Sequence, residues 1–452
     1  MTTNENNRLT AQIQDALEQK DTERLRFLLR KQRPEDIAEA CHFLHAYECD
    51  HILELLPPDV AGHVLYELDP VVRGEVGEML DPRVVSEALT ALAPEEAADV
   101  FEVFSDEFTE SVLGYMNPEA YGSIEKLMSY RPDSAGGIMT PDVFWLHEDT
   151  SVDEAVYTLQ DTEDIDAISY LYVVDKDRRL TGVMPLKRLI TSDGNRKLAD
   201  VATRDVISAR VDDDQEDVAH MVEKYDFSAL PIVDAQGVLV GRVKSDDVID
   251  VFQEETTEDM QKVGSVMPLN TSVLNASFTA LYLRRVVWLV LLVFVNIFSG
   301  AGIAHYEELI EAVVALVFFL PLLIDSGGNS GSQAATLIIR SLATGDVRVG
   351  DYSRLLLREV AVSLMLGLSM AAAVFFLGLY RADIQVALAV SLSMVCIVIM
   401  GSLLGMSLPF ILARFKMDPA TASAPLVTSM ADVLGVLIYL SIANAMLGIA
   451  NG

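Results

Sequence analysis

One aspartate, Asp432, interrupts an otherwise apolar run near the C-terminus, where Val427, Met430 and Val433 surround it in the sequence. A carboxylate at mid-membrane depth costs about 2.5–3.5 kcal/mol, so it normally faces a pore or a partner. Mg²⁺ is a hard ion that prefers oxygen ligands and keeps much of its water. These residues predict Asp432 as a cation contact in a pore, for which Mg²⁺ is a candidate, with the backbone carbonyl of Thr428, one turn earlier, as a second contact. The alternative is a structural aspartate that is hydrogen-bonded to a neighbouring helix.

A second polar interruption lies in an earlier apolar run, where Asp325 is followed by a stretch rich in glycine and serine that ends at Gln333. We predict that residues 327–331 break the helix and free backbone groups, which a membrane tolerates only beside a cavity or inside protein. Broken helices of this kind mark ion pathways in transporters. Asn329 offers a neutral oxygen, and Asp325 offers a charge for an outer pore. Capping of the following segment is an equally open interpretation of Asp325.

Acidic residues also gather in residues 212–217, 246–250 and 254–259, ahead of the apolar part. Any one of them alone is most simply a solvated surface charge. At the helical spacing of four, Glu254 and Glu258 share a face and repel each other. The set therefore predicts a surface that stays compact when cations, above all millimolar Mg²⁺, bridge it.

The charge is divided unevenly along the chain, which carries 33 Lys+Arg against 67 Asp+Glu, a net charge of −34. Residues 1–283 hold 24 basic and 57 acidic residues, whereas residues 284–452 hold 9 and 10. An acidic part of this kind would repel phosphates, so we predict no nucleic-acid partner. It favours cation binding or plain solubility.

Cys41, His45 and Cys49 are spaced by four residues and would share one face of a continuous helix. A zinc site is one interpretation, and buried packing residues are the other, because structural zinc ligands are usually spaced across turns. The chain has 3 cysteines, which indicates no disulfide framework and a reducing compartment. No nucleophile elbow, P-loop or HExxH pattern is present, so we predict no enzyme.

Five apolar runs follow from Val286, at residues 286–304, 309–339, 355–380, 384–415 and 420–450. Each reaches the ~20 residues that cross a bilayer core, so we predict five spans and contact with membrane lipid. Basic residues precede the first run and fill the loops after the second and the fourth: Arg284, Arg285, Arg340, Arg348, Arg354, Arg358, Arg414 and Lys416. The positive-inside rule then places the N-terminal part in the cytoplasm and the C-terminus outside.

Prolines recur every 12 residues, at Pro58, Pro70, Pro82 and Pro94, and a leucine stands two residues before each. Proline suits the first turn of a helix, so the repeat predicts a superhelix of short helices over residues 8–130. Such stacked repeats usually serve as a scaffold or docking surface.

A second repeat aligns residues 169–190 with residues 228–249 without gaps. Each copy is typical of a strand, turn, strand and helix with a further helix upstream, and the pair resembles tandem CBS domains. Such pairs usually sense small ligands. CBS domains that bind nucleotides usually hold the ribose with a Thr or Ser followed three residues later by an Asp. The first copy has neither residue at these positions, and the second copy has only Asp247. Phe227 and Asp246 remain as contacts for weakly bound ATP.

The whole arrangement resembles the MgtE family of bacterial magnesium channels. The motifs that carry the resemblance are the Gly-Gly-Asn stretch after Pro321 and the run Ala424–Gly435 that follows Asp418-Pro419. The resemblance implies a multidomain fold: an α-helical superhelical N-terminal domain (8–130), tandem α/β CBS domains (131–252), a connecting plug helix (253–283) and a five-span α-helical membrane domain (284–452). It also implies a homodimer in the bacterial plasma (inner) membrane.

In the family, magnesium bridges the cytoplasmic domains and the pore mouth and so closes the channel. The positions of the CBS pair and plug helix that match its acidic ligands are Asp214, Glu216, Asp226, Asp247, Asp250, Glu255, Glu258 and Asp259. In the helical repeats Glu95 and Asp99 match an acidic pair, whereas His63 replaces another acid. Glu311 and Asp418, at the two ends of the membrane region, match further ion contacts.

Two other functions fit parts of the sequence. A carrier for Mn²⁺ or Co²⁺ would use the same scaffold, although all-oxygen ligands disfavour softer metals. A CBS sensor that is merely anchored in the membrane would need neither Asp432 nor a polar second span. We therefore predict a Mg²⁺-selective channel that is gated by intracellular Mg²⁺.

Overall fold

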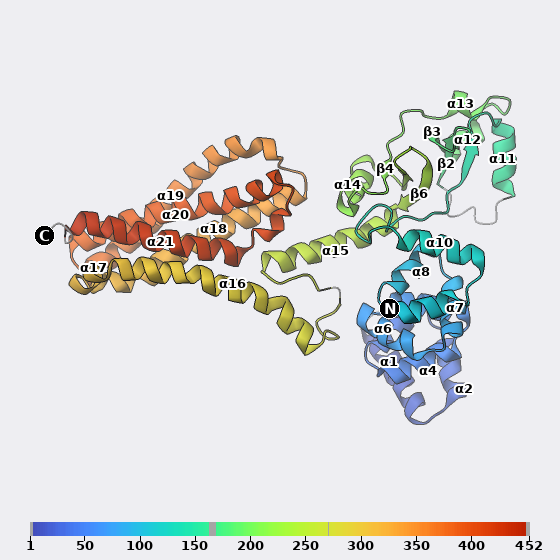
Figure 1. Ribbon diagram of the computed structural model, residues 1–452, viewed down its shortest axis with the longest axis horizontal. Helices are drawn as coiled ribbons and strands as arrows, with labels where there is room; N and C mark the ends of the chain where they lie inside the picture. The colour runs from blue at the N-terminus through green and yellow to red at the C-terminus, as the bar shows by residue number, and fades with distance from the viewer. Residues whose placement is uncertain (1–2, 162–168, 270, 449–452) are drawn as a thin grey trace. The chain divides into compact units, whose positions relative to one another are not determined.

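A computed structural model describes residues 3–161, 169–269 and 271–448, and the chain divides into two compact units. The first unit contains Met1–Glu255 with Asn270–Asn275, and the second contains Thr256–Leu269 with Ala276–Gly452. Figure 1 shows both units, with many of their helices and strands labelled.

The predicted 12-residue repeat is confirmed, because four consecutive helices begin at the four repeated prolines. Asp69 and Asp81 cap two of them by accepting the backbone N–H of Val71 and Arg83. Most of these helices pack on the one two places further along, as α3 does on α5 and α5 on α7, and this packing builds a superhelix. The helices are α1 (Thr3–Glu18), α2 (Thr22–Leu29), α3 (Pro34–Cys41), α4 (Ala46–Leu55), α5 (Pro58–Glu67), α6 (Pro70–Met79), α7 (Pro82–Thr90), α8 (Pro94–Phe101), α9 (Asp106–Leu113) and α10 (Pro118–Met128).

The second repeat forms two small sheets with the same topology, in which a parallel pair is extended by an antiparallel hairpin. The first module contains β1 (Trp145–His147), α11 (Val152–Gln160), β2 (Tyr170–Val174), β3 (Leu180–Pro185), α12 (Leu186–Thr191) and α13 (Leu198–Val201). The second contains β4 (Ala209–Arg210), α14 (Gln215–Tyr225), β5 (Ala229–Val233), β6 (Leu239–Lys244) and α15 (Ser245–Val263). Both hairpins have a register shift at the equivalent place, which confirms the internal repeat.

One hydrophobic core extends from Leu9 in α1 to Val251 in α15. It includes the helical repeats and the second sheet module, whereas the first module has a separate core around Val173. The helical repeats therefore pack as one body with the second module.

The connecting helix is shorter than predicted. The predicted plug helix spans residues 253–283, but α15 ends at Val263 and the next helix begins at Phe278. Ser265 has a positive φ of 57°, which an α-helix excludes, and Pro268 follows it. The helical part of the connection is therefore the end of α15, the last helix of the second sheet module, which has 19 residues and so about five turns.

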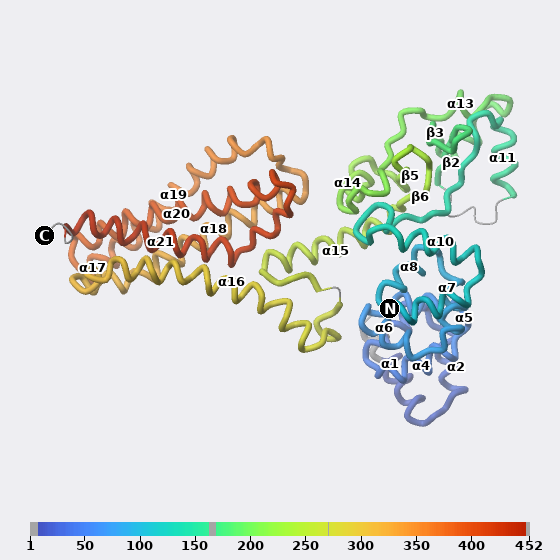
Figure 2. Tube along the Cα trace, in the orientation of Figure 1, coloured from blue at the N-terminus to red at the C-terminus, as the bar shows by residue number. Residues whose placement is uncertain are grey.

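The second unit contains four helices, among the described residues, that are long and apolar enough to cross a membrane. They are α16 (Phe278–His305), α19 (Tyr352–Arg381, preceded by the 3₁₀ turn η1, Val349–Asp351), α20 (Ile384–Arg414) and α21 (Ala424–Leu447). The short α17 (Glu307–Ala312), α18 (Ala315–Ala343) and the 3₁₀ turn η2 (Pro419–Thr421) complete the unit. Figures 1 and 2 show α18, α20 and α21 side by side, and the three helices contact one another.

The predicted break at residues 327–331 is wrong, because α18 continues through it as one helix of 29 residues. Its glycines serve close packing instead. A methyl group added to Gly401 of α20 would lie 2.2 Å from the carbonyl oxygen of Gly327, and one added to Gly405 would lie 1.9 Å from that of Gly331. Each helix thus presents two glycines four residues apart, a spacing that lets membrane helices approach closely. The Oγ atoms of Ser330 and Ser402 add a hydrogen bond of 2.6 Å.

Candidate cation pathway and regulatory acids

Asp432 lies in α21, eight residues after its first residue and so about 12 Å along the helix. Its side chain is half-buried, and among the described residues it forms no hydrogen bond and no ion pair. The alternative of a structural aspartate bonded to a neighbouring helix therefore finds no support in the described residues. An unpaired carboxylate inside an apolar bundle has the property expected of a group that meets a cation.

The polar side of α18 faces the same part of α21. Thr428 contacts Ser332 through their hydroxyls at 3.1 Å, and a methyl group at Gly328 would lie 2.8 Å from the Thr428 Cγ2. Asp325 is close enough to Asp432 for the two carboxylates to repel each other, and it accepts a hydrogen bond of 2.9 Å from the amide of Asn329. The structure thus brings together Asp432, Thr428 and Asp325. Because α21 is a continuous helix, the Thr428 carbonyl lies within its hydrogen-bond ladder.

In the first unit, Lys244 stands between two of the predicted acids. Its Nζ is 3.6 Å from Glu95 Oε1 and 3.6 Å from Asp247 Oδ1. Glu95 is 8% exposed and accepts a hydrogen bond from Thr140, while its Oε2 accepts none from the residues that the structure describes. Burial raises the pKa of Asp247 to about 6, although Lys244 opposes that shift. Burial also disfavours the charged form of Lys244. The carboxylates of Asp247 and Glu95 have the larger effect, and they raise the pKa of Lys244. A lysine thus neutralises an acidic pair that was predicted to bind magnesium.

We expect Lys244→Met to make the stability of the chain depend on magnesium. Without the ammonium group, Glu95 and Asp247 keep uncompensated charge, so unfolding without Mg²⁺ should become easier by about 1–3 kcal/mol. Millimolar Mg²⁺ should restore most of that loss, because a divalent ion can take the place of the ammonium group. Unfolding of the full chain with and without Mg²⁺ measures this. Lys187→Met is the control, since Lys187 is exposed near the start of α12, just after the equivalent strand of the first module, and forms no ion pair among the described residues. An equal loss with and without Mg²⁺ would contradict the prediction.

Asp99 lies four residues after Glu95 on α8, in a second acidic group of the first unit. Burial, followed by the charge of Glu102, raises the pKa of Asp99 to about 7, while Arg73 opposes the shift. Glu254 of α15 adds a further repulsive charge. Acids of the helical repeats and of α15 therefore face one another here.

This environment predicts a pH-dependent stability that Asp99→Asn should remove. The folded pKa of about 7 exceeds the unfolded value of about 3.9. The stability that protonated Asp99 contributes to the folded chain is therefore fully present below about pH 4 and is lost as the pH rises through 7. In Mg²⁺-free buffer, Asp99→Asn should stabilise the chain by about 1–2 kcal/mol at pH 8 and leave it unchanged near pH 4. Chemical unfolding at both pH values checks this, with the exposed Asp106→Asn as control. A gain that is equal at both pH values would rule out titration as its cause.

Other predicted acids lie around the start of α14. Asp214 is exposed and caps α14 by accepting the Glu216 N–H, and Glu216 lies 3.8 Å from the imidazole of His220. Gln215, between them, donates a 2.7 Å hydrogen bond to Glu255 of α15. The structure thus joins the Asp214–Glu216 turn to α15. Asp226 is exposed at the other end of α14, in a left-handed conformation, so it lies apart from this group.

In the second unit, a lysine again joins two predicted acids. Lys262, in the last turn of α15, forms ion pairs with Glu258 and, at 2.6 Å, with Asp418. Asp418 also caps η2, and the hydroxyl of Ser265 lies 2.6 Å from that of Ser423, the N-cap of α21. The end of α15 is thereby fastened to the start of the helix that carries Asp432.

The remaining predicted site residues lie at the margins of these groups or outside them, and two of them still act on members of the groups: Asp250 repels Glu254, and Asp246 repels Asp247. Glu311 is exposed on α17, Asp250 is exposed on α15, and Asp259 is half-buried on α15. His63, which replaces an acid, lies 3.9 Å from Glu96. Phe227 stacks on Tyr225, and Asp246 is exposed in the first turn of α15. Within the described part of the chain, no group of three or more His, Cys, Asp or Glu side chains is arranged to hold a metal ion.

The zinc interpretation fails because Cys41 and Cys49 do not share a helix. α3 ends at Cys41, and α4 begins after His45. Both cysteines are buried, and the Cys49 thiol donates to the Cys41 carbonyl. They are core residues.

Sequence reasoning missed two features. The glycine pairs of α18 and α20 have a spacing that could have identified a helix contact. Lys244 and Lys262 carried no such signal, because only the fold brings them between acids that are distant in sequence.

Comparison with known proteins finds three family models along the chain. The model described as "Divalent cation transporter" (MgtE) matches residues 320–442, the MgtE intracellular N domain matches residues 32–133, and the CBS domain matches residues 135–193 and 198–254. A magnesium transporter MgtE from Thermus thermophilus is 38% identical over 444 residues, covering 97% of this chain and 99% of its own. One from Bacillus subtilis is 34% identical and covers 78% of each chain.

A solved structure, the cytosolic domain of the Mg²⁺ channel MgtE in complex with ATP, is 35% identical to this chain. It aligns with a TM-score of 0.50 and covers 54% of this chain and 99% of that one.

Proposed function

The chain belongs to the MgtE family of divalent cation transporters, and we propose that it is a Mg²⁺-selective channel for magnesium uptake that intracellular Mg²⁺ closes. The family is one of transporters, so we propose no catalytic activity for the chain.

The observation that carries this proposal is the unpaired, half-buried carboxylate of Asp432 inside the apolar helix α21. An anchor for a sensor would not need this group, because it only adds an insertion cost. One Asp432 from each subunit of a homodimer would place two carboxylates around a largely hydrated Mg²⁺. The hydroxyl of Thr428 lies one turn before them, and Asp325 adds negative charge nearby.

We propose five spans, with α18 as the fifth beside the four apolar helices. At 29 residues α18 is about 43 Å long, which exceeds the ~30 Å of a bilayer core. Its glycines and serines make it less apolar, but many of them are buried against α20 and α21. The basic residues near the ends of α16, α18, α19 and α20 favour cytoplasmic N-terminal domains and an external C-terminus in a bacterial inner membrane.

Lipid and a second subunit are the proposed partners of the apolar surface. In α16, Leu289, Val293, Phe294 and Ile297 are exposed within a single chain. A patch of this kind marks contact with a membrane or with another chain.

For gating, we propose that Mg²⁺ bridges the acids of the helical repeats, the sheet modules and α15. Glu95, Asp99 and Asp247 lie in groups where carboxylates crowd together, which supports a role for bridging cations. Lys262 and Asp418 connect the end of α15 with the start of α21, so a change at α15 can reach the helix of Asp432. The domain limits 8–130, 131–252, 253–283 and 284–452 remain part of this proposal.

ATP is the proposed regulatory ligand of the CBS pair, because the similar cytosolic domain was solved with ATP. Phe227 and Asp246 are its proposed contacts in this chain.

Flux into liposomes that contain the purified full chain tests the function. We expect Mg²⁺ entry to exceed Ca²⁺, Mn²⁺ and Co²⁺ entry, and to fall when Mg²⁺ is added on the side of the N-terminal domains. Equal entry of Mn²⁺ or Co²⁺ would favour the broader carrier. Absence of cation entry, together with failure to rescue the growth of a magnesium-transport-deficient strain, would favour the anchored sensor.

A further inference from the structure

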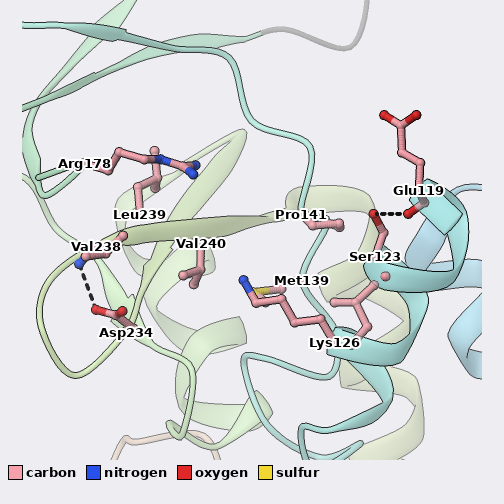
Figure 3. A pocket seen from close by; sticks show the side chains of 12 residues that line it. Glu119, Ser123, Lys126, Met139, Pro141, Arg178, Asp234, Val238, Leu239 and Val240 are labelled. Atoms are coloured by element: carbon pink, nitrogen blue, oxygen red, sulfur yellow. Dashed lines mark hydrogen bonds between the residues drawn. The ribbon is translucent and has the colours of Figure 1, made fainter.

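A cavity of about 450 Å³ lies in the first unit, where α10 meets the turns of the two β-hairpins (Figure 3). Its floor is apolar and includes Met139, Leu239 and Val240. Phe227 and Asp246, the proposed nucleotide contacts, do not line it. A volume of this size lies within the usual range for small-molecule sites, about 300–1,000 Å³.

Two cations point into this cavity. Figure 3 shows the Arg178 guanidinium and the Lys126 ammonium directed into the space between α10 and the hairpin, while the carboxylate of Glu119 points away. Asp234 also lines the cavity, but its carboxylate accepts the backbone N–H groups of Gln236 and Val238 at 2.8 and 2.9 Å. Among the described residues, neither Lys126 nor Arg178 forms an ion pair.

Arg178 is held in place by its surroundings. Its φ of 61° fixes it in the hairpin turn, and its carbonyl accepts the Leu239 N–H at 3.1 Å, which joins the two hairpins. Its guanidinium lies 4.7 Å from the centre of the Trp145 ring. A guanidinium stacked on an aromatic ring keeps its N–H edge available for an anion. Lys126 lies in the last turn of α10, where the helix dipole favours a cation, but the dipole does not account for Arg178.

We propose that this cavity binds a phosphorylated small metabolite, with its phosphate between Lys126 and Arg178 and its organic part on the apolar floor. Phosphate is the anion that both side chains recognise well, arginine through paired hydrogen bonds and lysine as a point charge. The site would connect α10 of the helical repeats with both sheet modules. Binding there does not depend on transport, so failure of the proposed channel function would leave it unaffected.

The test is titration calorimetry on the full chain, with inorganic phosphate, glucose 6-phosphate and AMP as probes. We expect saturable binding of at least one phosphomonoester, weakened about tenfold or more by Lys126→Met and by Arg178→Met. Gly122→Leu should block binding without removing a charge, because Gly122 lines the cavity and an added Cβ meets no atom within 4 Å. This variant should also fold well, since leucine is a better helix former than glycine.

A variant of the proposed nucleotide contacts, Phe227→Ala with Asp246→Asn, is the matched control and should leave this binding unchanged. Binding that this control abolishes, while Gly122→Leu and Lys126→Met retain it, would assign the ligand to the nucleotide site and overturn the proposal. The absence of saturable binding of all three probes at millimolar concentration would overturn it as well.

Discussion

Asp432→Asn should remove Mg²⁺ influx through the proposed channel almost completely while the chain stays folded. The substitution keeps the shape of the side chain and removes its charge. We expect a loss of about a hundredfold or more, which corresponds to ~2.8 kcal/mol and matches what an isolated mid-membrane carboxylate costs. The folded protein should not become less stable, because Asp432 forms no hydrogen bond or ion pair among the described residues. Flux into liposomes, with thermal unfolding of the same samples, measures both effects.

The matched control is Asp383→Asn. Asp383 belongs to the same helical unit, but it caps α20 by accepting the Val386 N–H at 2.9 Å. Its replacement should change flux little and weaken the cap slightly, since asparagine also caps helices well. Asp432→Ala should behave like Asp432→Asn if charge is the essential property. Wild-type flux in Asp432→Asn would show that this side chain is not the ion contact.

The elements that could be predicted were those with a strong local pattern. The prolines at intervals of 12 predicted the starts of α5 to α8, because proline is favoured at the first turn of a helix and disfavoured in its interior. The duplicated hairpins followed from the gapless alignment of two segments. The error at residues 327–331 has a physical reason. Glycine has a low helix propensity, but two helices that pack backbone against backbone retain it where any Cβ would clash.

The candidate site was predicted unevenly for a similar reason. Asp432 could be identified because a carboxylate in an apolar run is rare whatever the fold. The partners of the proposed regulatory acids could not be predicted, because Lys244 and Glu95 are 149 residues apart in the sequence and Lys262 and Asp418 are 156 residues apart. A sequence shows an excess of acidic residues, but it does not show which of them a lysine neutralises in the folded chain.

Lys262→Met should shift the closure of the proposed channel to higher Mg²⁺ concentrations. Lys262 forms ion pairs with Glu258 of α15 and with Asp418 beside η2, so it holds these two parts together without a metal. Both carboxylates raise the pKa of Lys262, against the effect of its burial, so the ammonium group stays charged at neutral pH. When Lys262 is replaced by methionine, Glu258 and Asp418 repel each other at low Mg²⁺. The closed arrangement then forms only when a divalent ion bridges the two carboxylates.

The size of the shift follows from the ion pair. A partly exposed pair contributes about 1 kcal/mol, so the Mg²⁺ concentration for half closure should rise about three- to tenfold. Lys262→Arg keeps the charge and should keep the wild-type curve. Adding Glu258→Gln and Asp418→Asn to Lys262→Met removes the repulsion, so the channel should close less steeply with Mg²⁺ than Lys262→Met alone. Recordings across a series of internal Mg²⁺ concentrations measure all three variants.

If Lys262→Met and the wild type close at the same Mg²⁺ concentration, the ion pair only supports the fold. The gate must then act through other contacts of α15, such as the hydrogen bond between Ser265 and Ser423.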